Sequence, residues 1–187
     1  MASGKINPEN YDSLKLCWSR EKVTEVASRG GRLEYTVDEL MRASWIDFED
    51  VMVAVCNTEV MDAEVLYTYA GRAARGQLAI IEQALPGETV FAEAVAASLT
   101  GDTIEIAEAS TKVDRALVRL SKENLDDNVN SALASVRASV HMNPGSAAMG
   151  TAINAAAAQG NTKTAKTEQK ELLRTVFREA EVMKWHS

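Results

Sequence analysis

The chain has few of the residues from which catalytic and metal sites are usually built. Its 187 residues include only two histidines, His141 and His186, and two cysteines, Cys17 and Cys56. None of them has the spacing of metal ligands. Phosphate-binding glycine loops, dinucleotide fingerprints and nucleophile elbows are also absent. We therefore expect a protein that is not an enzyme and has no metal and no cofactor; an enzyme of unrecognised type is a less favoured alternative.

Prolines, aromatic residues and long apolar runs are scarce as well. Three prolines and 5% aromatic residues, beside abundant alanine, favour helices over sheets. The longest apolar runs are too short to span a bilayer and no export signal is recognisable, so we expect no membrane partner. Both cysteines lie in apolar runs and are expected to be buried thiols. The hydrophobic content of 46% is enough for one helical domain over residues 1–187.

Capping and stop signals predict where the helices begin and end. Three pairs have the pattern of a capping box: Thr36 with Glu39, Ser44 with Asp47, and Asp102 with Glu105. Residues 61–85 are expected to form one long helix, or two helices broken near Gly71 or Gly76. A later helix is expected to stop at Asn143-Pro144-Gly145.

The composition changes after this stop. Residues 144–167 are small and polar, with almost nothing large to bury, which predicts a mobile loop. An apolar helical pattern resumes over 168–187 and includes Leu173, Val176 and Phe177. We expect this C-terminal helix to dock back on the helical body or on a neighbouring subunit.

Basic residues are concentrated on one predicted helix, although the whole chain has a net charge of −7. Lys112, Arg115, Arg119 and Lys122 follow one another at spacings of three, four and three, which places them on one helix face. Such a face can present cations to a phosphate backbone. The ordinary alternative is a solvated face with salt bridges. Arg72 and Arg75 form a second candidate, because their glycine and alanine neighbours allow a phosphate close approach, or else they are exposed arginines beside a helix break.

The end of the chain resembles a known viral signature. Arg174, Phe177 and Trp185 form an R-x-x-F-x7-W pattern, which is similar to the C-terminal signature of coat proteins from rod-shaped plant RNA viruses of the tobamovirus, hordeivirus, furovirus and benyvirus types. Those families usually have Glu directly after the Phe, whereas this chain has Arg178.

Two further segments resemble the same proteins. In KVDRALVRLS, residues 112–121, Lys112 and Asp114 match the basic and acidic positions that open the tobamovirus RNA-binding helix, and Arg115 replaces a second acidic residue. Trp18, in CWSREKVTEV, lies where a family Trp begins the first long helix.

The resemblance implies an all-α fold, an antiparallel four-helix bundle with additional short helices. It also implies a coat protein that polymerises into a helical rod around single-stranded RNA, located in the virion and in the host cytoplasm before assembly. Lys112, Asp114, Arg115, Arg119 and Lys122 would contact RNA, with Arg72 and Arg75 as further candidates. Trp18, Arg174, Phe177 and Trp185 would serve subunit packing, and Glu123, Asp126 and Asp127 would form a carboxylate switch. The alternative is a helical adaptor that binds a partner through its C-terminal amphipathic helix.

Overall fold

The computed structural model describes residues 5–6, 20–31 and 35–184 of this chain. The protein is all-α. The described strands are β1 (Lys5–Ile6) and β2 (Tyr35–Thr36), which form one short antiparallel pair with Ile6 opposite Tyr35. Trp18, Trp185 and Cys17 lie outside the described residues.

The helices follow one another through short connections. In chain order they are α2 (Arg20–Arg29), α3 (Val37–Arg42), α4 (Phe48–Val55), α5 (Ala63–Arg75), α6 (Leu78–Ala84), α7 (Val90–Thr100), α8 (Thr103–Leu120), α9 (Asp127–Ser139), α10 (Pro144–Ala158) and α11 (Lys163–Lys184). None of the described helices combines the length and the apolar character that a membrane-spanning helix requires.

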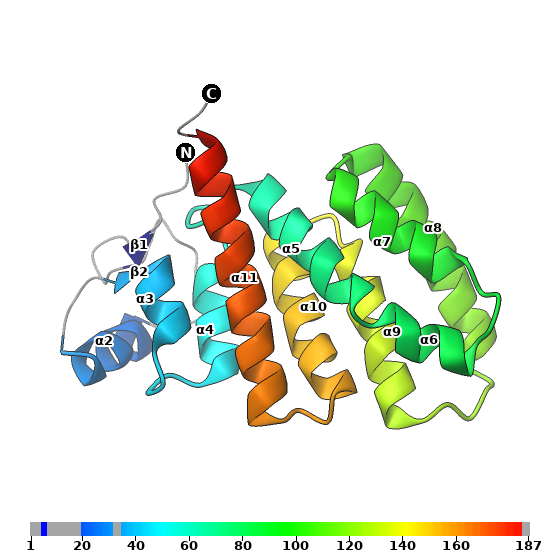
Figure 1. The fold of residues 1–187 in the computed structure, drawn as a ribbon, viewed down its shortest axis with the longest axis horizontal. Helices are drawn as coiled ribbons and strands as arrows, with labels where there is room; N and C mark the ends of the chain where they lie inside the picture. Colours follow the sequence, from blue (N-terminus) through cyan, green and yellow to red (C-terminus); the bar gives the residue numbers. More distant parts are fainter. Residues whose placement is uncertain (1–4, 7–19, 32–34, 185–187) are drawn as a thin grey trace.

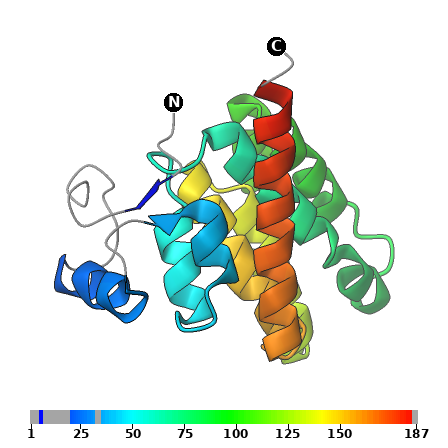
Figure 2. The same ribbon diagram turned by 60° about the vertical axis from the view of Figure 1, so that its left-hand side comes forward.

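Two hydrophobic clusters share the central helices α5 and α10 (Figure 1). The first cluster joins α3, α4 and α11 to one side of these helices, and Leu66, Tyr69 and Leu173 are among its buried side chains. The second joins α6, α7, α8 and α9 to the other side, around Phe91 and Ile106. The protein therefore has a core on either side of a central pair of helices. Figure 2 shows α11 beside α3 and α4.

Several predicted boundaries are confirmed. Thr36 and Glu39 form a reciprocal capping box at the start of α3, and the Asp102 side chain accepts hydrogen bonds from the amides of Ile104 and Glu105. Residues 61–85 contain two helices, which meet at Gly76. Asp47 itself occupies the cap position of α4, so the prediction of a cap at Ser44 was wrong.

The prediction of a mobile loop over residues 144–167 is also wrong. Residues 144–158 form α10, which packs against α9 and α5, and most of its alanines are completely buried. Asn143 does not stop the preceding helix but caps the next, since its side chain accepts a hydrogen bond from the Ser146 amide at 2.8 Å. Pro144 occupies the first turn, where a missing N–H costs nothing.

The C-terminal helix α11 packs along α5, α10 and α3. Leu173 and Val176 are buried in the first cluster, and Phe177 packs against it. The hydroxyl of Tyr69 in α5 donates a hydrogen bond to Gln169 of α11 at 3.1 Å, deep in this contact. The helix begins at Lys163, five residues before the predicted start.

Candidate nucleic-acid interface

The helix α8 presents its basic residues on the surface. Its buried stripe consists of Ile106, Ala109, Val113 and Ala116. Lys112, Arg115 and Arg119, which we name the α8 cation row, are exposed and lie within an arc of about 60° around the helix axis. The predicted common face is therefore confirmed for these three residues, whereas Lys122 lies beyond the end of α8 at Leu120.

The α8 cation row borders a hollow between α7 and α8, which we name the α7–α8 hollow. Its volume is about 370 Å³. Glu88, Val90, Lys112, Arg115, Ala116 and Arg119 line it. Three cations and one carboxylate thus face the same small space, so the hollow has a net positive lining.

Two of these cations already have carboxylate partners. Lys112 Nζ lies 3.3 Å from Oε2 of Glu93 in α7, and Arg119 forms an ion pair with Glu88, just before α7. The side chains of Lys112 and Arg119 are 57% and 63% exposed, so water competes with both pairs. Arg115 has no ion-pair partner among the described residues. No motif or spacing in the sequence identifies Glu88 and Glu93 as partners of these cations, because only the packing of α7 on α8 brings them together.

Two further residues predicted to contact RNA, Asp114 and Lys122, are not part of the α7–α8 hollow. Asp114 accepts hydrogen bonds from Arg137 of α9, on the other side of α8, so it does not line the α7–α8 hollow. Lys122 is exposed just beyond the end of α8.

The arginine pair of α5 does not join the α8 cation row. Arg72 forms an ion pair with Glu179 of α11 at 2.7 Å, and Arg75 is exposed at the end of α5. The neighbouring glycine serves helix packing: a Cβ at Gly71 would lie 2.6 Å from Cγ of Leu99 in α7. The small residues here admit another helix.

The carboxylates proposed as a switch are gathered at one end of the second cluster. Glu123 lies in the connection between α8 and α9, Asp126 occupies the N-cap position of α9 without a side-chain capping hydrogen bond, and Asp127 begins the helix. All three are exposed. The arrangement brings three negative charges within five residues of one surface turn.

A second line of cations runs along α11 at every fourth residue. We name Lys166, Lys170, Arg174 and Arg178 the α11 cation row. Lys166 Nζ lies 3.0 Å from Glu49 of α4 and 5.8 Å from the centre of the Phe48 ring. Lys170 donates to the carbonyl of Ala43 at 2.9 Å, and burial lowers the pKa of its ammonium. This row faces α3 and α4 and joins α11 to them through Asp38, the Ala43 carbonyl and Glu49.

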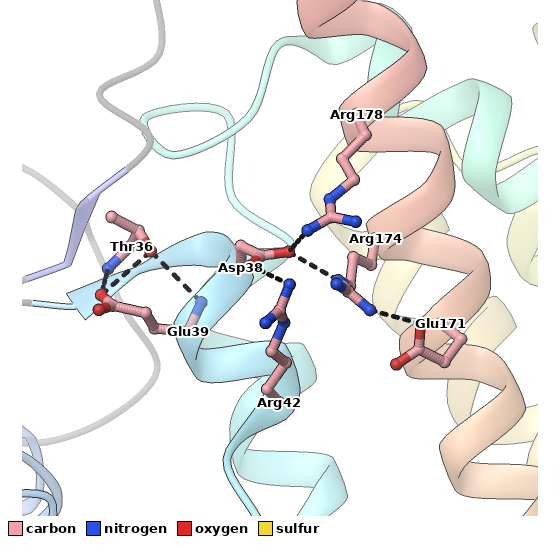
Figure 3. Close-up of polar contacts among 7 residues, drawn as sticks. All are labelled: Thr36, Asp38, Glu39, Arg42, Glu171, Arg174 and Arg178. Carbon is pink, nitrogen blue, oxygen red and sulfur yellow. Dashed lines mark hydrogen bonds and ion pairs between the residues drawn. The ribbon is translucent and has the colours of Figure 1, made fainter.

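Asp38 is the centre of the upper part of this contact (Figure 3). Its carboxylate lies 2.6 Å from Arg174, 2.9 Å from Arg178 and 3.0 Å from Arg42. Arg174 also contacts Glu171 at 2.9 Å. Burial tends to raise the pKa of Asp38, but the hydrogen bond from Arg174 and the surrounding arginines outweigh it and lower the pKa.

The motif residue Arg174 therefore has an intrachain role in this structure. It joins α11 to α3, and Arg178, at the position where the coat-protein families have Glu, contributes to the same contact. Asp38 was missed by sequence reasoning, although it follows the recognised cap residue Thr36 by two positions. No described group of three or more His, Cys, Asp or Glu side chains has the arrangement of a metal site.

Comparisons with protein-family models, with curated proteins and with solved structures find no match to this chain. The resemblance to viral coat proteins consequently rests on the motifs themselves.

Proposed function

We propose that this protein is a viral coat subunit that assembles into a helical rod and encloses single-stranded RNA through phosphate contacts with little sequence preference. The observation that supports this most directly is the α8 cation row, since three exposed cations border one hollow. RNA phosphates attract such a group regardless of base sequence, because binding releases condensed counterions.

The ion pairs in the hollow are compatible with this role. A phosphate that approaches Arg115 meets a cation without a resident partner among the described residues, and it can displace Glu88 or Glu93 from the neighbouring cations. Exposed pairs contribute little to folding, so their exchange has a small cost. The net charge of −7 is then no obstacle, because each subunit needs only a few cations for its short piece of RNA.

The experiment that tests RNA binding removes the α8 cation row. For the variant Lys112→Gln/Arg115→Gln/Arg119→Gln we expect about 100-fold weaker binding to an oligouridylate at 0.1 M salt. The slope of log affinity against log salt should become shallower by about two. The control Arg115→Lys/Arg119→Lys keeps the charges and should bind nearly as well as the natural chain. Equal binding by the triple-Gln variant would contradict the proposal.

We propose further that α5, α7, α9 and α10 correspond to the antiparallel four-helix bundle of the coat-protein families. Each of these helices packs against at least two of the others. The helices α8 and α11 would then flank the bundle, with α8 facing RNA. The subunit would occur in the virion and, before assembly, in the host cytoplasm.

Glu123, Asp126 and Asp127 would act between subunits as the carboxylate switch. Like charges on a surface turn repel similar turns nearby, and salt screens this repulsion. Raising the pH and lowering the salt concentration should therefore loosen the rod. Negative-stain microscopy with and without RNA tests this, and an assembly insensitive to both conditions would count against the role.

The adaptor hypothesis has less support in the structure. Its binding stripe was expected on α11, but Leu173 and Val176 are buried against the body of the same chain. An adaptor should form small particles of fixed size that do not respond to RNA, whereas a coat subunit should form rods.

A further inference from the structure

Large exposed apolar side chains are concentrated on two helices. Of the six that the described residues contain, Ile104 and Val118 belong to α8, and Val182 and Met183 belong to α11. Val118 is 72% exposed and Met183 is 64% exposed. Single exposed apolar residues are ordinary, but their occurrence on two helices directs attention to two candidate contact surfaces, one around Met183 and one around Val118.

The first surface is a hollow between α5 and α11, which we name the α5–α11 hollow. Its volume is about 310 Å³. Asp62, Glu64, Val65, Thr68, Arg72, Val176, Glu179, Ala180 and Met183 line it. Valine, alanine and methionine side chains supply the apolar part, while three carboxylates stand against one arginine, which is held by Glu179. The hollow is therefore apolar and its border is acidic.

The second surface is the outer face of the C-terminal half of α8. Val118 lies about 120° around the helix axis from Lys112 and about 60° from Arg115, so this face borders the α8 cation row on its Arg115 side. Ile104 lies about 40° from Val118 around the axis but in the first turn of α8, about 21 Å along the helix from Val118, so it does not belong to this surface. Lys122, four residues after Val118, is exposed and has no ion-pair partner among the described residues. This face is therefore apolar and basic, which complements the α5–α11 hollow in both respects.

The two surfaces belong to opposite ends of one series of helices. Helix α11 packs on α5, α5 packs on α7, and α7 packs on α8. Figure 1 shows α8 at the right-hand side and α11 to the left of α5. A copy can therefore offer both surfaces to different neighbours at the same time.

We propose that the outer face of α8, centred on Val118 and Lys122, docks into the α5–α11 hollow of a second copy of this chain. This inference rests on the proposed self-assembly and names the surfaces that produce it. Val118 enters the apolar part beside Met183, and Lys122 faces the acidic border at Glu64. Because the two surfaces differ, each copy keeps one free, and the contact continues as an open chain of subunits.

The decisive test mixes two variants that each lack one surface. Val118→Asp damages the α8 face, and Met183→Asp damages the α5–α11 hollow. In the absence of RNA, sedimentation should show that self-association of either variant alone is at least about tenfold weaker than that of the natural chain. An equimolar mixture should form dimers, because each variant retains one intact surface. Met142→Asp, which changes an exposed methionine that neither lines the α5–α11 hollow nor belongs to α8, is the matched control.

Charge variants give a second readout that leaves the apolar residues in place. Glu64→Lys and Lys122→Glu should each weaken association, and their mixture should restore it, since the opposite charges then face one another. Monomeric natural chain, mixtures that stay monomeric, or an equal defect in Met142→Asp would overturn the proposed contact. Oligouridylate binding by the natural chain is measured separately, so a failed contact is distinguishable from a failed RNA-binding function.

Discussion

The two cation rows of this protein contain the same residue types and differ in what surrounds them. In the α11 cation row, Arg174 is 17% exposed and shares Asp38 with two other arginines. In the α8 cation row, Arg119 is 63% exposed and has one carboxylate partner. Helical spacing alone does not separate a row that holds two helices together from a row that is available to a ligand; burial and the number of partners do.

The largest expected effect follows from breaking the α11 cation row. Asp38→Asn should lower the free energy of unfolding by about 1–2 kcal/mol, because three arginines lose their shared carboxylate. Urea unfolding measures this. Affinity for an oligouridylate should stay within about twofold of the natural value. If Asp38→Asn were as stable as the natural chain but no longer bound RNA, the α11 cation row would be the RNA-binding row, contrary to the proposal.

The same row should make stability depend on pH in the acid range. The pKa of Asp38 and the pKa of Glu49 are both lowered in the folded protein, although burial opposes the shift in each case. Their stabilisation is therefore complete above the carboxyl pKa of the unfolded chain, about 4, and is lost as the pH falls through the lower folded values. The difference in unfolding free energy between the natural chain and Asp38→Asn should shrink between pH 6 and pH 3.

A smaller effect on stability, with a gain in binding, is expected from the carboxylates of the α8 cation row. Glu88→Gln/Glu93→Gln should change the free energy of unfolding by less than about 1 kcal/mol, since both pairs are on the surface. Affinity for an oligouridylate should rise about 3- to 5-fold, because the phosphate no longer displaces a resident carboxylate. The control Glu168→Gln/Glu171→Gln removes the same charge on α11. A comparable gain in that control would show a general charge effect.

The smallest effect on the subunit itself is expected at the turn between α8 and α9. Glu123→Gln/Asp126→Asn/Asp127→Asn should leave the unfolding free energy within about 0.5 kcal/mol of its natural value. Rods of this variant should persist at lower salt than natural rods, as turbidity or microscopy would record. Unchanged salt dependence would remove these three residues from the switch.

Local signals predicted much of the fold, because they depend on neighbours in the sequence. Thr36 with Glu39 and Asp102 with the following amides act over three residues, and both caps form as expected. The face shared by Lys112, Arg115 and Arg119 follows from helical periodicity in the same way. The carboxylates that meet these cations come from other helices, and neither a spacing nor a motif identified them.

The error over residues 144–167 has a specific physical cause. A segment with small side chains was expected to lack burial, yet Ala147, Ala148 and Ala152 are completely buried in α10. Alanine has the highest helix propensity, and its small side chain lets neighbouring backbones approach closely. A helix rich in alanine can therefore be buried because its neighbours pack close to it, without large side chains. Asn143-Pro144 was interpreted as a stop, although the same pair favours a start.

This alanine-rich helix has a consequence for how the chain tolerates substitution. Ala148, Ala152 and Ala156 belong to the first cluster, while Ala147 and Ala158 belong to the second. These methyl groups are in close contact with neighbouring helices, so a larger side chain at any of these positions would require the helices to move apart. In a saturation mutagenesis screen, the buried alanines of α10 should therefore be among the positions that tolerate the fewest substitutions. Leucine should be rejected there almost as strongly as aspartate.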